Sequence, residues 1–205
     1  MLDYLWNRIE KNTLCFIVLS YFSFASKERW VKEDLIKYYK ILPIKYFKKK
    51  EKIECIIFRY FPLIWSVKKK MKKIKKTKTL SVVGRIKGHV RYLEGEKNKG
   101  FNLKILKRIL ERCAEKNMKI IILTTPFTSY YNSFFSENLL KEKFYKDIYK
   151  LKEEYKIDYI DFSHKYKIFE KKEYFDDFDH LNEKGSEIFM QELNYILKEK
   201  NIILN

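Results

Sequence analysis

The amino-acid sequence predicts an α/β protein built on a parallel β-sheet with helices on its faces. Three short β-rich runs are separated by segments with helical periodicity, and this alternation is typical of strands joined by crossover helices. The chain has 205 residues, which is the size of one ordinary α/β domain. Hydrophobic residues make up 46% of it. This much apolar surface offsets the entropy of ordering a core and excludes a wholly disordered chain.

The predicted strands are short apolar runs. The first has no polar alternation, which predicts a strand covered on both faces. Reactive groups of parallel sheets gather where the strands end at their carboxyl side. Residues 20–24, residues 124–133 and the segment after the third strand are therefore the candidate site regions. The three runs are Leu14–Leu19, Lys119–Thr124 and Ile157–Phe162.

The predicted helices carry apolar residues at helical spacing. Ser136 and Asn182 are the expected N-caps of the second and third helices. Residues 27–100 break the alternation of strands and helices. We interpret them as a lysine-rich elaboration, made of helices and loops, of a single domain that spans residues 1–205. The three helices are Phe101–Asn117, Ser136–Tyr155 and Glu183–Lys200.

The charge of the chain is strongly positive, with 45 Lys and Arg against 27 Asp and Glu. Only seven of the basic residues are arginine, the residue that reads base edges and phosphates bidentately. We therefore expect no specific nucleic-acid partner. The run Lys68–Lys78 is either a solvated helix face or a patch for an acidic polymer or an anionic membrane surface.

Targeting and metal-binding patterns are absent from the printed sequence. No apolar run approaches the roughly 18–20 residues that span a bilayer, and residues 1–11 lack the features of a signal peptide. We expect a cytoplasmic protein as written, or a cell-envelope protein if an N-terminal anchor has been lost.

Cys15, Cys55 and Cys113 fit neither a disulfide framework nor a zinc site, so they are predicted core residues. No metal or cofactor is expected.

The stretch from Asp177 to Gly185 is the one motif that indicates chemistry. Asp177 lies three residues before His180 and could accept a hydrogen bond from the Nδ1–H of its ring, which would leave Nε2 free as a general base. Asn182 would anchor the following helix, and Gly185 would let its first turn approach neighbouring backbone. The alternative is an ordinary capped helix junction.

Three other polar residues are given structural roles. Asp179 is expected to be a solvated carboxylate or a partner of the helix N-terminus. His89 and His164 have no acidic setting in the sequence, and we expect them to be structural or exposed.

The block Asp177-Phe178-Asp179-His180-Leu181-Asn182, with Gly185, resembles the last conserved block of the SGNH/GDSL hydrolase superfamily. This superfamily includes esterases, lipases and polysaccharide O-acyltransferase-type proteins of bacterial envelopes. The resemblance implies a flavodoxin-like, three-layer α/β/α fold with His180 as base and Asp177 as its orienting carboxylate. It implies a relative of acyl ester hydrolases or O-acyltransferases that act on envelope polysaccharide.

The strand and loop at residues 121–132 are similar to the cleft-lining segment of the same superfamily. The resemblance implies a substrate-binding role for Thr125, Tyr130 and Tyr131, with Ser20 as a further candidate. The alternative is a surface loop whose aromatic rings pack on the rim of the sheet.

The nucleophile block of the superfamily, a G-D-S or G-S-S sequence after the first strand, is not found in the printed sequence. Ser20 and Ser23 follow a strand but have no glycine-flanked turn. We expect either a chain that lacks the first β-α unit or a degenerate relative kept for binding, and a poor catalyst in both cases. The alternative function is non-enzymatic binding of an acidic polymer or membrane surface through Lys68–Lys78.

Overall fold

A computed structural model describes residues 6–25, 47, 49–61, 63, 82–96 and 99–202. The chain divides into two compact units, of which Lys11–Ser26 with Gly84–Asn205 carries the sheet. Met1–Glu10 with Lys27–Val83 forms the other unit. Its described helix is α3, Lys49–Tyr60, which lies within residues 27–100, the region predicted to consist of helices and loops. The lysine run Lys68–Lys78 lies outside the described residues.

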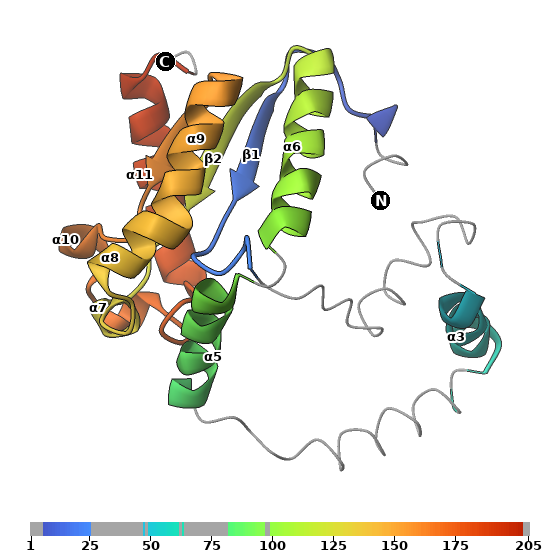
Figure 1. The fold of residues 1–205 in the computed structure, drawn as a ribbon, viewed down its shortest axis with the longest axis horizontal. Coiled ribbons are helices and arrows are strands. Elements are labelled where there is room, and N and C mark those ends of the chain that lie inside the picture. Colours follow the sequence, from blue (N-terminus) through green and yellow to red (C-terminus); the bar gives the residue numbers. More distant parts are fainter. Residues whose placement is uncertain are drawn as a thin grey trace. The chain divides into compact units, whose positions relative to one another are not determined.

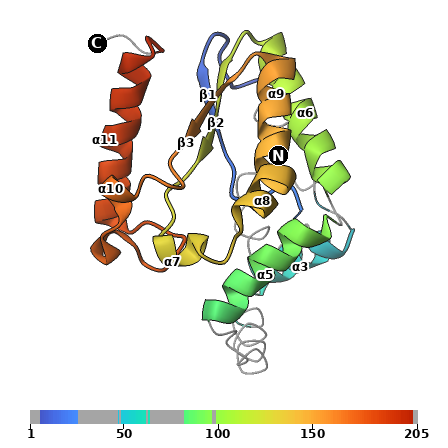
Figure 2. The same ribbon diagram turned by 60° about the vertical axis from the view of Figure 1, so that its left-hand side comes forward.

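The sheet is three-stranded and parallel within the described residues, in the order β1-β2-β3 (Figure 1 shows β1 and β2, and Figure 2 shows all three strands). Its strands are β1, Leu14–Val18, β2, Lys119–Thr124, and β3, Asp158–Asp161. Phe16 of β1 lies opposite Ile121 of β2, and Leu123 of β2 lies opposite Ile160 of β3. The predictions of a mixed α/β chain and of a parallel sheet are therefore confirmed.

The helices of this unit lie on both sides of the sheet, with α11 on one side and α6 and α9 on the other (Figure 2). Successive strand residues point to opposite faces. Ile121 and Leu123 accordingly pack in one core cluster with Leu193 and Leu197 of α11. Leu110 of α6 is fully buried, and α6 contacts β2 while α9 contacts β3. The main helices are α5, Val82–Gly95, α6, Lys99–Glu115, α9, Lys146–Tyr155, and α11, Glu183–Glu199.

The predicted helix over Ser136–Tyr155 contains a wider π-helical turn. Its parts are α8, Glu137–Leu140, the turn η2, Lys141–Tyr145, and α9. Ser136 caps it as predicted, because its side chain accepts a hydrogen bond from the backbone N–H of Leu139. The wide turn carries one residue more than an α-helical turn. Phe144 is fully buried there, and the neighbouring Tyr145 hydroxyl donates to Asp161 Oδ2 at 2.9 Å.

The expectation that the first strand is covered on both faces is wrong. Within the described sheet β1 is an edge strand, and Phe16 and Val18 are 39% and 55% exposed. A continuous apolar run does not distinguish an interior strand from an edge strand with one open face. Here the alternation appears only in the burial of the side chains, which is greater at Cys15 and Ile17 than at Phe16 and Val18.

The three cysteines are free thiols, and the prediction that they lie in the core is confirmed for two of them. Cys55 and Cys113 are buried, and Cys15 is half-buried with its sulfur 4.0 Å from that of Cys113. Burial and the neighbouring Cys15 raise the pKa of Cys113 to about 12, so its thiol stays protonated near neutral pH. No helix of the described ranges has the length and apolar character needed to cross a membrane.

Candidate functional site

The predicted motif forms a closed loop between η3, Lys172–Tyr174, and α11. Phe175 and Leu181 form an antiparallel bridge at its base. Just inside that bridge, the backbone N–H of Asp176 donates to the carbonyl of His180 at 2.9 Å. Asn182 caps α11, because its side-chain oxygen accepts from the N–H of Gly185 at 2.9 Å. The loop that carries His180 is thus held at both ends.

Gly185 brings the first turn of α11 against backbone, as predicted. A Cβ atom at this position would overlap the carbonyl oxygen of Tyr174. It would also lie 3.0 Å from the carbonyl carbon of Tyr174 and 3.1 Å from Leu181 Cδ2. The same Tyr174 carbonyl accepts the backbone N–H of Asn182 at 3.0 Å. A side chain here would therefore displace the loop from the helix.

The loop is fixed to the carboxyl end of the sheet through the segment that follows β2. The backbone N–H of Thr128 and its hydroxyl both donate to the carbonyl of Phe178, at 3.2 and 3.0 Å. Thr128 also caps the short helix α7, Ser129–Asn132. These contacts place the tip of the loop beside the end of β2, where reactive groups of parallel sheets gather.

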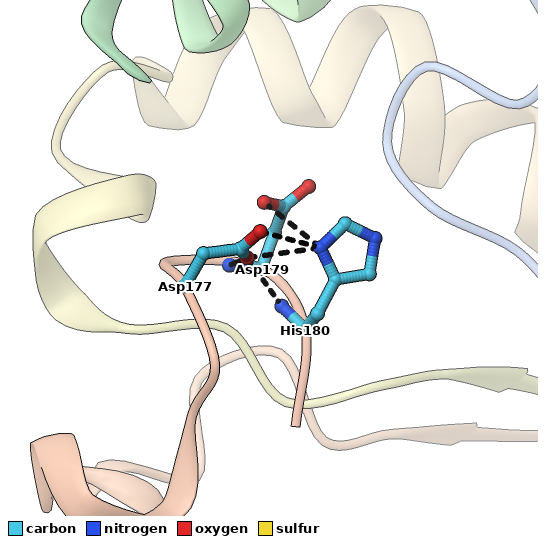
Figure 3. A group of neighbouring side chains, drawn as sticks. All are labelled: Asp177, Asp179 and His180. Atoms are coloured by element: carbon cyan, nitrogen blue, oxygen red, sulfur yellow. Dashed lines mark hydrogen bonds and ion pairs between the residues drawn. The ribbon is translucent and has the colours of Figure 1, made fainter. Parts of the chain in front are cut away.

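Asp177 and His180 form the predicted pair. His180 Nδ1 lies 2.9 Å from Asp177 Oδ1 and 3.0 Å from Oδ2 (Figure 3). Asp177 Oδ1 also accepts the backbone N–H groups of Asp179 and His180, at 3.1 and 3.0 Å. Because an ionised carboxylate can only accept, the proton in this contact belongs to Nδ1. In the neutral form of this ring the lone pair is then on Nε2, and the side chain is 63% exposed.

Arg85 of α5 joins the pair from outside the motif. Its Nη1 donates to Asp177 Oδ2 at 2.9 Å, and its Nη2 donates to Asp179 Oδ1 at 2.5 Å. The Asp179 side chain is only 6% exposed. The expectation of a solvated carboxylate at Asp179 is therefore wrong, because the residue is buried in an ion pair with Arg85.

The two carboxyl groups differ in their electrostatic setting. Partial burial acts to raise the pKa of Asp177, but hydrogen bonds from Arg85, from the N–H of Asp179 and from His180 outweigh it and hold this pKa well below its ordinary value. Burial raises the pKa of Asp179 above its ordinary value, although Arg85 and His180 act in the opposite direction. Asp177 is thus the carboxylate that stays ionised beside the imidazole.

His89, which the sequence predicts to be structural or exposed, is a second histidine of the cluster. Its Nδ1 lies 3.0 Å from the Tyr131 hydroxyl and 3.8 Å from Asp179 Oδ2, and its ring stacks on Phe22 with centroids 4.0 Å apart. Burial, with the nearby charges of Arg85 and His180, lowers the pKa of His89 to about 4. His89 is therefore neutral at neutral pH.

A sequence signal for this pair exists. Arg85 and His89 are four residues apart, so a helix places them on one face. Both lie in the region that was interpreted as an elaboration, and no motif marked them.

The remaining predicted residues have different settings. Tyr131 is fully buried and contacts His89, whereas Tyr130 is exposed and its ring packs 4.6 Å from that of Phe178. Thr125 is half-buried just beyond β2. Ser20 is half-buried, and its backbone N–H donates to Ser23 Oγ at 2.8 Å. Among the described residues, no hydrogen bond joins Ser20 or Thr125 to His180.

The cluster also has the spacing of a cation site. Asp177, Asp179 and His180 each offer one ligand atom, and these atoms lie within 4.8 Å of one another. Arg85 already forms ion pairs with both carboxylates, so the guanidinium supplies the positive charge that they require.

An open cavity of about 680 Å³ lies beside the start of α11, and His180 is not among the residues that line it. They are Asp176, Asn182, Glu183, Lys184 and Glu187.

Chemically, the arrangement can accept a proton at Nε2 of an oriented imidazole and stabilise the resulting imidazolium through Asp177.

Comparison of the chain with protein-family models, curated proteins and solved structures found no match. Function is therefore inferred from the geometry of the cluster.

Proposed function

We propose that this chain is a relative of the SGNH/GDSL hydrolases with their flavodoxin-like, three-layer fold. Its substrate class would be acyl esters of an envelope polysaccharide, which it would hydrolyse or whose acyl group it would transfer. His180 is the proposed general base and Asp177 the carboxylate that orients it. The observation that carries this proposal is the contact of 2.9 Å between His180 Nδ1 and Asp177 Oδ1 at the carboxyl end of a parallel sheet.

The setting of Asp177 supports this role better than that of a surface ion pair. Its two oxygens accept from two backbone N–H groups, from Arg85 and from the His180 ring. A carboxylate with so many donors cannot rotate freely, and its lowered pKa keeps it charged. It therefore holds the imidazole in one tautomer, which is what a general base needs.

The proposed chemistry is limited because the printed sequence has no recognisable serine nucleophile. In the superfamily a serine attacks the ester, but the printed sequence has no G-D-S or G-S-S block, and Ser186, which follows Gly185, lies inside α11 and not in a strand-to-helix turn. For this chain alone we infer a slower route, in which Nε2 of His180 takes a proton from water and the hydroxide attacks the acyl carbonyl. The acyl–oxygen bond then breaks, and the imidazolium returns its proton to the departing alcohol. A sugar hydroxyl in place of water would give acyl transfer.

The test is the hydrolysis of an activated acetyl ester by the wild-type chain and by three variants. We expect His180→Ala to lower the rate roughly tenfold or more, and Asp177→Asn to cause most of that loss, because the amide no longer fixes the tautomer. His164→Ala is the matched control, since His164 is an exposed histidine whose Nδ1 contacts Ser163 Oγ at 2.9 Å. A serine-directed phosphonate probe should leave the chain unlabelled.

Simple imidazole reactivity gives a different pattern. An exposed histidine that acts as free imidazole would be insensitive to Asp177→Asn, and His164→Ala would lower the rate as much as His180→Ala. That outcome overturns the proposal. Labelling of Ser20 or Ser23 by the probe would instead overturn the slower route, because the chain would then hold an activated serine.

The alternative function rests on charge. A protein that binds an acidic polymer or membrane surface through the run Lys68–Lys78 would lose binding steeply with added salt and would be indifferent to His180→Ala.

A further inference from the structure

We propose that Arg85 is a positioning residue of this site, which sets the spacing of Asp177 and Asp179 so that His180 presents an unprotonated Nε2. The inference rests on the proposed function and adds to it a residue from α5, outside the motif. It follows from three features of the cluster, namely the fork of the guanidinium, the two carboxylates beside one imidazole nitrogen, and the neutral His89.

The guanidinium bridges the two carboxylates. Its two terminal nitrogens donate to different residues, Nη1 to Asp177 and Nη2 to Asp179. The planar fork therefore fixes the separation of these side chains, which the single point charge of a lysine would not do. The Arg85 Nε is buried and makes no hydrogen bond among the described residues. The two carboxylates thus hold the charged end of Arg85.

Both carboxylates lie close to the same imidazole nitrogen. His180 Nδ1 is 2.9 Å from Asp177 Oδ1 and 3.6 Å from Asp179 Oδ1. Without a cation they would repel each other, and together they would favour the doubly protonated ring. Such a ring has no lone pair at Nε2 and cannot act as a base. Arg85 neutralises one of the two negative charges and leaves Asp177 as the acceptor of the Nδ1 proton.

The other groups that face the cluster do not replace this charge. His89 of α5 is neutral near neutral pH because its pKa is about 4. The Tyr131 hydroxyl from α7 is buried against His89, and burial raises its pKa above the ordinary value, so it also stays neutral. Among the described residues that contact the two carboxylates, Arg85 is therefore the permanent cation.

The experiment reads the tautomer of His180 directly in the full chain labelled with ¹⁵N at histidine. In the wild type near neutral pH, nuclear magnetic resonance should show Nδ1 protonated and Nε2 unprotonated. In Arg85→Ala we expect this state to be lost, in favour of the Nε2–H form or of the doubly protonated ring. Arg85→Lys should restore it only in part. Arg91→Ala is the matched control on α5, because the Arg91 Nε bonds the carbonyl of Lys87 in its own helix.

The outcomes separate this inference from the proposed function, because the tautomer is measured without any substrate. If the wild-type chain hydrolyses the ester, Arg85→Ala should lower the rate of hydrolysis roughly tenfold. It should also move the acid limb of the pH profile of this rate to higher pH. A wild-type tautomer in Arg85→Ala at all pH values overturns the inference, even if hydrolysis depends on His180. If Arg85→Ala does not fold, a fully wild-type tautomer in Arg85→Lys overturns it instead.

Discussion

Gly185 offers a direct test of how the loop is attached to α11. In Gly185→Ala the new Cβ would overlap the carbonyl oxygen of Tyr174, which belongs to backbone and cannot turn aside. We expect overpacking to cost about 1–3 kcal/mol. Loss of the hydrogen bond from Asn182 to the same carbonyl would cost about 1 kcal/mol more. Alanine returns about 1 kcal/mol through its higher helix propensity.

The balance is a destabilisation of about 1–3 kcal/mol, because the last two contributions nearly cancel. For a chain of this length, 2 kcal/mol corresponds to a fall in Tm of roughly 4–8 °C, measured by circular dichroism on heating. Gly88→Ala is the matched control in the middle of α5, where a Cβ would meet nothing within 4 Å. It should raise the free energy of unfolding by about 0.5–1 kcal/mol. A Gly185→Ala protein as stable as Gly88→Ala would refute the packing of α11 described here.

Two further predictions concern residues around the site. The pKa of His89 is about 4 in the folded chain against about 6.5 when unfolded, so the folded chain binds fewer protons. The free energy of unfolding of the chain should then fall by about 2 kcal/mol between about pH 7 and pH 5, measured by urea titrations. His89→Gln should remove this pH dependence. If the free energy of unfolding of His89→Gln depended on pH as steeply as that of the wild type, the buried setting of the ring would be contradicted. Thr128→Val removes both the α7 cap and the hydroxyl donation to Phe178, and should cost about 1–2 kcal/mol. Ser136→Ala removes only a helix cap and should cost about 1 kcal/mol or less in the same thermal assay. If Thr128→Val and Ser136→Ala lost the same stability, the hydrogen bond from Thr128 to Phe178 would contribute nothing.

The sequence predicted the three strands, the helices α6, α9 and α11 and two of the N-caps, because these depend on local patterns. β2 occupies the predicted range, and Asn182 and Ser136 cap the predicted helices. The contact between Asp177 and His180 was also predictable, since it spans three residues of one turn. Even the packing of Gly185 followed from its place in the first turn of a helix.

The parts that failed depend on contacts between distant segments. Arg85 lies 92 residues before Asp177 in the sequence, and no periodicity links a residue of α5 to a loop near the end of the chain. The burial of Asp179 depends on that same ion pair, so the prediction of a solvated carboxylate failed with it. The exposure of Phe16 and Val18 on β1 depends on which segments of the chain pack on the faces of the strand, which the composition of the strand alone does not specify.

The π-helical turn η2 has a consequence for insertions and deletions. Removing one residue from Lys141–Tyr145 would let α8 and α9 merge into a single regular helix. Because the wide turn holds the one additional residue, the residues on either side of it would then keep their faces. Removing Lys146 or Asp147 from the regular helix α9 would instead rotate the residues on one side of the cut by about 100° relative to those on the other. Tyr145 and Ile148 could then no longer both face inward, and the Asp161 carboxylate would lose its tyrosine donor. A deletion of one residue should therefore be better tolerated within η2 than at the start of α9.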